Sequence, residues 1–495
     1  MDSTEYEGRV DARLRRELVA GRGWDGRGGM LGWRAMPSTV FDSFYFKDRF
    51  GSVAMRALWD DRATLQRWLD VEAALAEVQA ELGLVPKSVA REIARKARIE
   101  NLDLRALKRG FDRTWNPVVP VVDELRRHLS PRAAGCLHWG ATSKNVFDTA
   151  LTLQVRDSYA VVFAGLRAVA ALLAGLADEH RDTIMAGRTH GQHALPVTFG
   201  FKAAVWLDEL LRGEERLREG RKRVLVGEFG GAVGTFASLG RDGPRVQARL
   251  MKRLGLGVPA IPVKTAGDRL AEYVLHLAML SATLGKIAQG IHNLQQTEVD
   301  EVTESTEGRV GSSAMPHKQN PVASGSVVYL GRLLRANVLA ALDYIHPEGE
   351  DDHRQGETAW KFVPEACLLV DAQLGLLKRV LETLIVKPEN MRRNLERAGG
   401  FVTSEAVLMR LAAAVGRDRA HATVKALSDE ARRVDASFAT AVRSDPMVRE
   451  HLSARQIEEC LDERASLGQT RKLVDRVLAR YRRSRSRVAA GRPPA

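Results

Sequence analysis

Apolar residues recur three and four positions apart along most of this chain, which is the spacing of one face of an α-helix. The first such stretch runs from Ala54 to Leu84, and Gly83 and Pro86 end it because neither residue continues a helix well. Shorter stretches of the same kind cover residues 89–97 and 104–111. The pattern therefore predicts a small unit of packed helices near the N-terminal end.

The middle of the chain contains longer apolar stretches. Residues 150–178 are almost continuously apolar, so a membrane span is one interpretation. Arg167 at the centre of this stretch, together with many alanines and glycines, favours a helix buried among other helices. Helices are predicted over five long ranges, 150–178, 196–221, 270–294, 327–344 and 362–384. Together they predict a helical bundle without a membrane span.

Glycine, proline and charge mark the expected domain limits. Residues 1–38 combine charges with closely spaced glycines, which predicts a flexible arm. Residues 480–495 contain six arginines and no acid, which is typical of a disordered tail. We expect a flexible arm over 1–38, an N-terminal helical domain over 39–127, a central bundle over 128–386, a C-terminal helical domain over 387–480 and a basic disordered tail over 481–495.

Composition narrows the class of protein. With 45% hydrophobic, 28% charged and 6% aromatic residues, the chain is typical of a soluble, helix-rich globular protein. Its three cysteines have no metal-ligand spacing, and the N-terminal segment lacks the apolar core of a secretory signal, so we expect a cytoplasmic protein. The net charge of +13 is not accompanied by a recognisable nucleic-acid module, so we expect no nucleic-acid partner.

A glycine-rich interval covers residues 227–243. Its segment Gly230–Thr235 superficially resembles a phosphate-binding loop, but it lacks the Lys-Ser/Thr ending of a P-loop and the spacing of a dinucleotide fingerprint. Close backbone packing is the better interpretation of these glycines.

The segment Gly311–Pro321 is the most concentrated group of reactive side chains. It places the hydroxyls of Ser312 and Ser313 near the Lys318 ammonium and the Asn320 amide, after a glycine that permits an unusual backbone. Composition alone favours an ordinary polar loop, because Gly, Ser, Pro and Asn dominate loops for conformational reasons. A reactive loop is the alternative.

Two further polar clusters interrupt the apolar pattern. Thr142 and Ser143 precede an apolar helix, where they could be a helix cap or could bind a carboxylate with the amide groups of the helix N-terminus. The break at 187–192 contains His190, and a lone histidine is more often structural than catalytic. Neither cluster decides between these alternatives without further information.

Several of these motifs together resemble the fumarase/aspartase superfamily, in the branch of adenylosuccinate lyase and 3-carboxy-cis,cis-muconate cycloisomerase. The resemblance covers about Phe41 to Ala431, through the motifs Leu69–Ala76, Gly140–Ser143, Gly187–Gln192, Gly311–Pro321, Ser404–Val407 and Gly416–His421. It implies an all-α fold of three domains, in which the long central five-helix bundles of four subunits form one tetrameric core. It also implies active sites shared between subunits.

The resemblance implies a mechanism as well. Ser312 would take a proton from the carbon beside a carboxylate, Lys318 would stabilise the charge that develops, and His190 would supply or orient a proton for the leaving group. The implied substrate is a small dicarboxylate, and no metal or organic cofactor is implied. Substrate contacts are implied for Thr142, Ser143, Asn145, Arg188, Thr189, Gln192, Ser313, Met315 and Asn320.

Some positions depart from the pattern of this branch and bear on the substrate. They are Asn116, Asn145, Gly325, Gly349 and Asp351. Asn116, near which a histidine is expected, and the partial match over residues 351–361 weaken the expectation of a nucleotide substrate. Gly325 is more like the cycloisomerase branch, but Asn145 stands where an aspartate is usual and Gly349 and Asp351 replace an expected histidine and arginine. The sequence therefore predicts a carbon–nitrogen lyase that releases fumarate and ammonia, an amine or a nitrite-like group from a substituted succinate. A 3-carboxy-cis,cis-muconate cycloisomerase is the alternative, and a non-catalytic structural protein is a further alternative.

Overall fold

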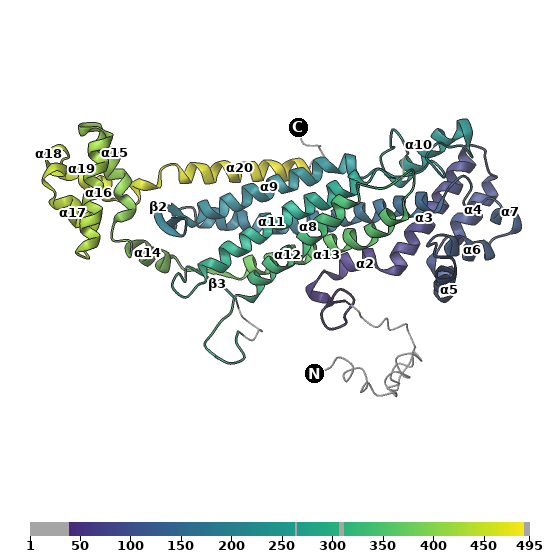
Figure 1. Ribbon diagram of the computed structural model, residues 1–495, viewed down its shortest axis with the longest axis horizontal. Coiled ribbons are helices and arrows are strands. Elements are labelled where there is room, and N and C mark those ends of the chain that lie inside the picture. The colour runs from purple at the N-terminus through teal and green to yellow at the C-terminus, as the bar shows by residue number, and fades with distance from the viewer. Residues whose placement is uncertain (1–38, 263–264, 306–310, 490–495) are drawn as a thin grey trace, which may run out of the picture. The chain divides into compact units, whose positions relative to one another are not determined.

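The computed structural model describes residues 39–262, 265–305 and 311–489, and Figure 1 shows its helices and strands. The chain divides into two compact units, Met1–Lys47 and Asp48–Ala495. In the first unit the described residues 39–47 form turns, in which Thr39 Oγ1 donates to Asp42 at 3.0 Å. The predicted arm over 1–38 lies outside the described residues. All other elements below belong to the second unit, apart from the 3₁₀ helix at the junction.

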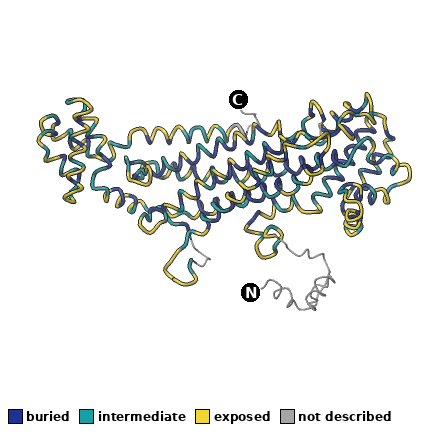
Figure 2. The backbone as a smooth tube through the Cα atoms, viewed as in Figure 1, coloured by how far each residue is buried: buried dark blue, intermediate teal, exposed yellow. Residues whose placement is uncertain are grey.

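Five long helices form the bundle in the described part of the second unit. They are α8 (Ser143–Glu179), α9 (Phe199–Val224), α11 (Asp268–Leu294), α12 (Val322–Asp343) and α13 (His353–Glu382), and they lie side by side in Figure 1. Their inward faces are buried along their length, as the dark blue segments of Figure 2 show. The predicted all-α fold and its five long helices are confirmed.

Three of these helices are apolar enough to raise the question of a membrane. Among the described residues, α8, α11 and α12 could each cross a membrane by length and composition, and their most apolar windows are 44%, 50% and 39% buried. In α8 the polar interruptions are satisfied locally, because Gln154 donates to Leu58 O at 2.7 Å and Arg167 is exposed. All three helices pack against other helices of the bundle.

A smaller group of helices surrounds the start of α8. They are α2 (Val53–Trp59), α3 (Asp61–Glu81), α4 (Lys87–Lys96), α5 (Leu104–Thr114), α6 (Val119–Arg127), α7 (Pro131–Ala134) and α10 (Gly243–Leu254). Asp60 separates α2 from α3 and accepts the Ala63 amide at 2.7 Å, which makes it an N-cap. Helix α6 begins at Val119. Pro120 fits there because the first turn of a helix needs no amide donor.

An antiparallel hairpin joins α8 to α9. Its strands are β1 (Ile184–Thr189) and β2 (Gln192–Thr198), and its tip is His190-Gly191, where φ is 52° and 78°. Positive φ at both positions is the geometry of a type I′ turn. The expectation that a helix begins at Pro196 is wrong, because Pro196 lies in β2. Helix α9 starts after Thr198, whose hydroxyl accepts the Phe201 amide at 3.1 Å.

Most of the remaining elements lie after the signature loop, which is the segment Gly311–Pro321. Strand β3 (Val302–Glu304) precedes this loop and pairs with β4 (Leu384–Val386). The helices that follow are α14 (Pro388–Glu396), α15 (Ser404–Val415), α16 (Arg417–Arg433), α17 (Phe438–Ser444), α18 (Pro446–His451), α19 (Ala454–Leu461) and α20 (Thr470–Ala489). Short 3₁₀ helices cover Lys47–Arg49, Ile99–Asn101, Gly240–Asp242, Phe401–Thr403 and Ala465–Leu467.

Helix α20 corrects one expectation. The predicted disordered tail begins at residue 481, but α20 continues to Ala489 and packs against α9. Arg480 pairs with Asp208 at 2.5 Å, and Arg485 pairs with the buried Glu214. Acidic residues of α9 therefore pair with two arginines of this helix. Residues 490–495 lie outside the described residues, and the other expected domain limits remain predictions.

The glycine-rich interval 227–243 packs closely, as expected. A side chain at Gly230 would lie 2.8 Å from the Gly234 backbone, and one at Gly243 would lie 2.4 Å from Phe236. These glycines are therefore required by backbone approach rather than by phosphate binding.

Candidate active site

The signature loop folds back on itself. Ser312 Oγ accepts hydrogen bonds from the backbone amides of Met315 at 3.0 Å and Ala314 at 3.4 Å. Asn320 Nδ2 donates to Gly311 O at 2.7 Å, and a side chain at Gly311 would lie 2.5 Å from the Lys318 carbonyl oxygen. The loop is therefore a compact turn in which the Ser312 oxygen faces amide hydrogens.

The other predicted residues of this loop are accessible. Ser313 and Lys318 are exposed, and Met315 is 43% exposed. The structure thus brings Ser312, Ser313, Met315, Lys318 and Asn320 together on one short segment of chain, most of which faces solvent.

Glu304 holds the two ends of this segment together. Its carboxylate is almost fully buried and accepts the backbone amides of Ala323 at 2.8 Å and Ser324 at 3.0 Å. These are unpaired amides at the start of α12, where a carboxylate is stabilised by the helix dipole. Gln295 in turn accepts the Glu304 amide at 2.7 Å. Sequence reasoning missed Glu304, whose partners lie 19 and 20 positions away.

The second cluster lies at the start of α8, where Thr142 is the N-cap residue. Ser143 Oγ donates to Asn116 Oδ1 at 3.1 Å. The same oxygen accepts the Val118 and Val119 amides, both at 3.0 Å, so Asn116 caps α6 and also orients Ser143. Asn116 thus has a structural function at the position where the sequence departs from the pattern of its branch.

Asn145 is part of the scaffold of this cluster. It is only 1% exposed, and its Oδ1 accepts the amides of Thr142 at 3.2 Å and Gly231 at 3.1 Å. Its Nδ2 has no hydrogen-bond partner among the described residues. Asn145 therefore joins the start of α8 to the glycine-rich interval, and its contact with substrate remains a prediction.

Two buried ionic contacts near this cluster were not predicted. Lys144, with a side chain only 4% exposed, lies 3.0 Å from Asp148 and 5.3 Å from the ring centroid of Phe147. His138 Nδ1 lies 2.5 Å from Glu72 Oε1. Burial lowers the pKa of His138, but the hydrogen bond and charge of Glu72 outweigh burial and raise that pKa above its usual value. Only the i, i+4 spacing of Lys144 and Asp148 could have indicated a pair.

The hairpin carries the third cluster. Thr189, His190 and Gln192 are exposed at its tip. Arg188 is oriented inward, and its guanidinium donates to both oxygens of Glu301, at 2.7 and 3.0 Å. Because the Glu301 side chain is fully buried, this is an internal ion pair. Arg188 is therefore engaged with the protein in this structure, and its contact with substrate remains a prediction.

One chain does not bring all three clusters together. Helix α8 has 37 residues and separates Ser143 from the hairpin by about 55 Å, at ~1.5 Å per residue. Figure 1 shows β2 and helices α4 to α7 at opposite ends of the bundle. The Thr142–Ser143 cluster therefore cannot contact His190 of the same chain.

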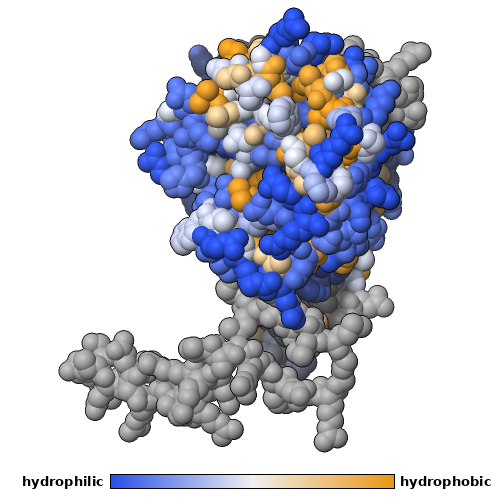
Figure 3. All heavy atoms as spheres, turned by 90° about the vertical axis from the view of Figure 1, so that its right-hand side faces the viewer, coloured by the Kyte–Doolittle hydropathy of each residue, from blue (hydrophilic) through white to orange (hydrophobic). Residues whose placement is uncertain are grey.

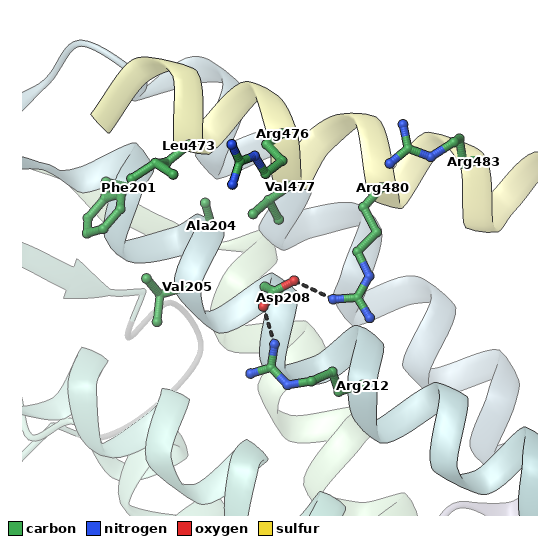
Figure 4. A pocket seen from close by; sticks show the side chains of 10 residues that line it. All are labelled: Phe201, Ala204, Val205, Asp208, Arg212, Leu473, Arg476, Val477, Arg480 and Arg483. Atoms are coloured by element: carbon green, nitrogen blue, oxygen red, sulfur yellow. Dashed lines mark hydrogen bonds and ion pairs between the residues drawn. The ribbon is translucent and has the colours of Figure 1, made fainter. Parts of the chain in front are cut away.

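Two surface grooves lie away from these clusters. The first, of about 490 Å³, runs between α9 and α20, where Asp208 pairs with both Arg212 and Arg480 (Figure 4). The second lies among α15, α19 and neighbouring residues, including Leu195. No predicted site residue lines either groove. Within the described residues, no group of three or more His, Cys, Asp or Glu side chains could hold a metal ion.

Comparison with known proteins gives matches over most of the chain. Residues 51–331 match a family model described as "Lyase", and residues 400–477 match one described as "Adenylosuccinate lyase C-terminus". Adenylosuccinate lyase of Methanothermobacter thermautotrophicus is 39% identical over 87% of this chain and 97% of its own length. N-acetyl-S-(2-succino)cysteine lyase of Dickeya dadantii is 36% identical over 90% of this chain and 98% of its own. A solved 3-carboxy-cis,cis-muconate lactonizing enzyme of Pseudomonas putida superposes with a TM-score of 0.82 at 35% identity, covering 89% of this chain and 99% of that one.

Proposed function

Because the chain belongs to the lyase family of the fumarase/aspartase superfamily, we propose that it catalyses β-elimination from a substituted succinate and releases fumarate. Ser312 takes the proton from the carbon beside a carboxylate. The electron pair of that C–H bond forms the new double bond, and the bond from the adjacent carbon to the leaving group breaks. His190 supplies or orients the proton that the leaving group takes up.

The hydrogen bonds at Ser312 carry this proposal. A serine acts as a general base through its alkoxide, and stabilisation of the negative charge increases the fraction of the serine that is in this form. Two backbone amides donate to Ser312 Oγ in this structure, and amide donors stabilise negative charge on oxygen. Lys318 lies on the same loop and supplies a positive charge for the substrate carboxylate, while Asn320 supplies an amide donor.

The relatives differ in the leaving group. One relative acts on adenylosuccinate and another on N-acetyl-S-(2-succino)cysteine, so both nitrogen and sulfur leaving groups occur among proteins of comparable similarity. We favour ammonia, an amine or a nitrite-like group. The second candidate is cycloisomerisation of 3-carboxy-cis,cis-muconate, which is supported by the close superposition on the lactonizing enzyme.

We also propose that the active site is shared between subunits of a homotetramer. The separation of Ser143 from the hairpin supports this, since two of the three clusters can meet only if different chains provide them. Several exposed apolar residues on the bundle would also be buried by contact with another subunit. They include Val205, Met279, Leu333, Leu339 and Leu342. Figure 3 views the end face near α4 to α7 and α10, which is mostly hydrophilic with hydrophobic residues gathered in its upper part.

A cytoplasmic location accords with three cysteines that form no disulfide.

A substrate panel tests this function. Purified protein is incubated with adenylosuccinate, N-acetyl-S-(2-succino)cysteine, other substituted succinates and 3-carboxy-cis,cis-muconate, and ultraviolet absorbance is followed. Appearance of fumarate supports the elimination. Loss of carboxymuconate absorbance without fumarate supports the cycloisomerase, and no reaction across the panel supports a non-catalytic protein.

Substitution of the base tests the mechanism. Ser312→Ala is expected to abolish turnover while the oligomer, measured by light scattering, stays intact. Ser444→Ala in α17 removes an exposed hydroxyl far along the chain and serves as the matched control. Full activity of Ser312→Ala would contradict the assignment of the base.

A further inference from the structure

A buried carboxylate, Glu301, lies where three parts of the fold meet. Arg188 from β1 donates to both of its oxygens, at 3.0 and 2.7 Å. Asn394 from α14 donates to Oε1 at 3.0 Å and also to the Val299 carbonyl oxygen at 2.6 Å. Glu301 itself immediately precedes β3, which leads into the signature loop. One side chain thus joins the hairpin, α14 and the start of the segment that carries Ser312.

The backbone around Glu301 is fixed by further bonds. The Glu301 amide donates to Leu294 O at 2.9 Å, and its carbonyl oxygen accepts the Lys387 amide at 3.0 Å. Asp300, with a left-handed φ of 46°, is held by Lys387 Nζ at 2.5 Å and by Asn390 Nδ2 at 2.8 Å. The strand pair β3–β4 and the Glu304 cap continue this fixed path as far as α12. The residues of β3 and the start of α12 are therefore held by several hydrogen bonds, although most of the described signature loop is exposed.

The buried charge of Glu301 keeps Arg188 bound to this carboxylate. The Glu301 side chain is fully buried and that of Arg188 is 21% exposed. A buried charge without its partner is strongly destabilising, so neither group can leave the other without a large penalty. Two further cationic groups face the pair. Burial, followed by the charge of Arg188, lowers the pKa values of His193 and Lys202, while the charge of Glu301 raises them. The bidentate contact of Arg188 distinguishes it from these two groups, since its guanidinium donates to both oxygens of Glu301.

We propose that Arg188 and Glu301 are positioning residues and that neither touches substrate. Their ion pair sets the orientation of the hairpin tip, which carries His190, relative to the loop root, by which we mean residues 301–304. This inference rests on the proposed function for its effect on catalysis. It replaces the expectation that Arg188 binds an anionic group of the substrate. The proposed action is mechanical: the bidentate geometry fixes both the distance and the angle between the hairpin and the loop root.

Hydrogen–deuterium exchange on the full-length protein tests the positioning directly. Glu301→Gln keeps the size of the side chain but removes its charge, and Arg188→Lys keeps the charge but removes the bidentate geometry. Both variants are expected to exchange at least about tenfold faster at hairpin residues 184–198 and at β3. Glu458→Gln is the matched control, because Glu458 also accepts two hydrogen bonds from an arginine, Arg443, but on the surface. The control is expected to leave exchange at both segments unchanged.

Kinetics separates positioning from binding. With the panel substrate that is turned over, both variants are expected to lower kcat about tenfold or more, with KM within about threefold of wild type. Glu301→Asp, which keeps the charge, is expected to recover part of kcat. A raised KM in Arg188→Lys with unchanged exchange would mean that Arg188 binds substrate, and this would overturn the proposal.

The two tests fail independently. If wild-type protein turns over no member of the panel, the proposed function fails, and exchange at the hairpin and at β3 still measures the positioning. If Ser312→Ala is inactive as expected but Glu301→Gln exchanges like wild type at both segments, the positioning proposal is wrong and the proposed function stands. Circular dichroism of each variant identifies a global loss of fold, in which case Arg188→Lys supplies the comparison.

Discussion

The carboxylate of Glu304 accepts the backbone amide of Ser324, and this contact closes the base of the signature loop across 20 positions of sequence. A second bond, from the Ala323 amide, lies on the other carboxylate oxygen. The two bonds therefore join the end of β3 to the start of α12, while Ser313, Met315 and Lys318 of the loop are exposed. Glu304 combines helix capping with loop closure, and its removal is expected to affect both stability and activity.

Glu304→Gln is the first prediction. Glutamine offers one acceptor oxygen, and its NH₂ group would face the second amide donor, so a buried donor is left unsatisfied. We expect a loss of about 1–3 kcal/mol in the free energy of unfolding, measured by chemical denaturation. Glu430→Gln, at an exposed ion pair on α16, should leave the free energy of unfolding close to that of wild type. Equal effects of the two substitutions would contradict the role of Glu304.

Trp115 gives a prediction of increased stability. It ends α5 with φ of 54°, a left-handed conformation that is unfavourable for a bulky residue, and its side chain is 84% exposed. Trp115→Gly should therefore stabilise the protein by about 0.5–1 kcal/mol. Trp115→Ala keeps a Cβ atom and should give no comparable gain. Thermal denaturation of both variants distinguishes release of backbone strain from loss of the indole ring.

Asn116 links stability to substrate binding. Asn116→Ala removes the acceptor for two amides of α6 and for the Ser143 hydroxyl, so we expect a loss of about 1 kcal/mol in the free energy of unfolding. Freed from Asn116, Ser143 should bind the substrate carboxylate less well and raise KM about three- to tenfold. Asn116→Asp keeps the acceptor and should keep stability, while its negative charge repels the carboxylate and raises KM further. An unchanged KM in both variants would exclude Ser143 from the substrate site.

The His138–Glu72 pair predicts a pH dependence. The folded-state pKa of His138 is raised, because the hydrogen bond and charge of Glu72 outweigh the lowering by burial. The stability from this pair is therefore fully present below the unfolded pKa of about 6.5 and is lost as pH rises through the folded pKa. The difference in unfolding free energy between wild type and Glu72→Gln should be largest below about pH 6 and should decrease above that range. If the difference in unfolding free energy between wild type and Glu72→Gln increased with pH, the predicted stabilisation of protonated His138 by Glu72 would be wrong.

The sequence predicted the elements whose evidence is local. The apolar seam of α11 and the continuous apolar run of α8 both correspond to helices, because a helix must bury such a face. The close packing of the glycine-rich interval also agrees with the sequence, since close backbone approach has a short-range signal in clustered glycines. The hairpin is not predicted by the apolar pattern, because its two strands are short and Pro196 fits the first turn of a helix, although His190-Gly191 is compatible with a turn.

The contacts of the site depend on partners that are distant in sequence. Arg188 lies 113 positions from Glu301, so the motif around Arg188 gave no indication that its charge is used internally. The tail after Arg480 was assigned to disorder from its own charge, whereas the acids that pair with it lie on α9. Asn116 was noted for what it replaces, and only the structure reveals the bond from Ser143.

In the assembly that we propose, the length of helix α8 sets the distance between two clusters of site residues. One end carries the Thr142–Ser143 cluster and the other leads to His190, so its 37 residues set where one subunit can contribute to two different active sites. Adding a single residue would shift one end by about 1.5 Å and rotate it by about 100° relative to the other. A helix with a solvent-exposed end could accommodate such a shift by local repacking. A helix whose two ends contribute to two active sites could not, because the shift would displace the residues at one of them. In the proposed assembly, the length of this helix therefore affects the geometry of the active sites as well as the packing of the bundle.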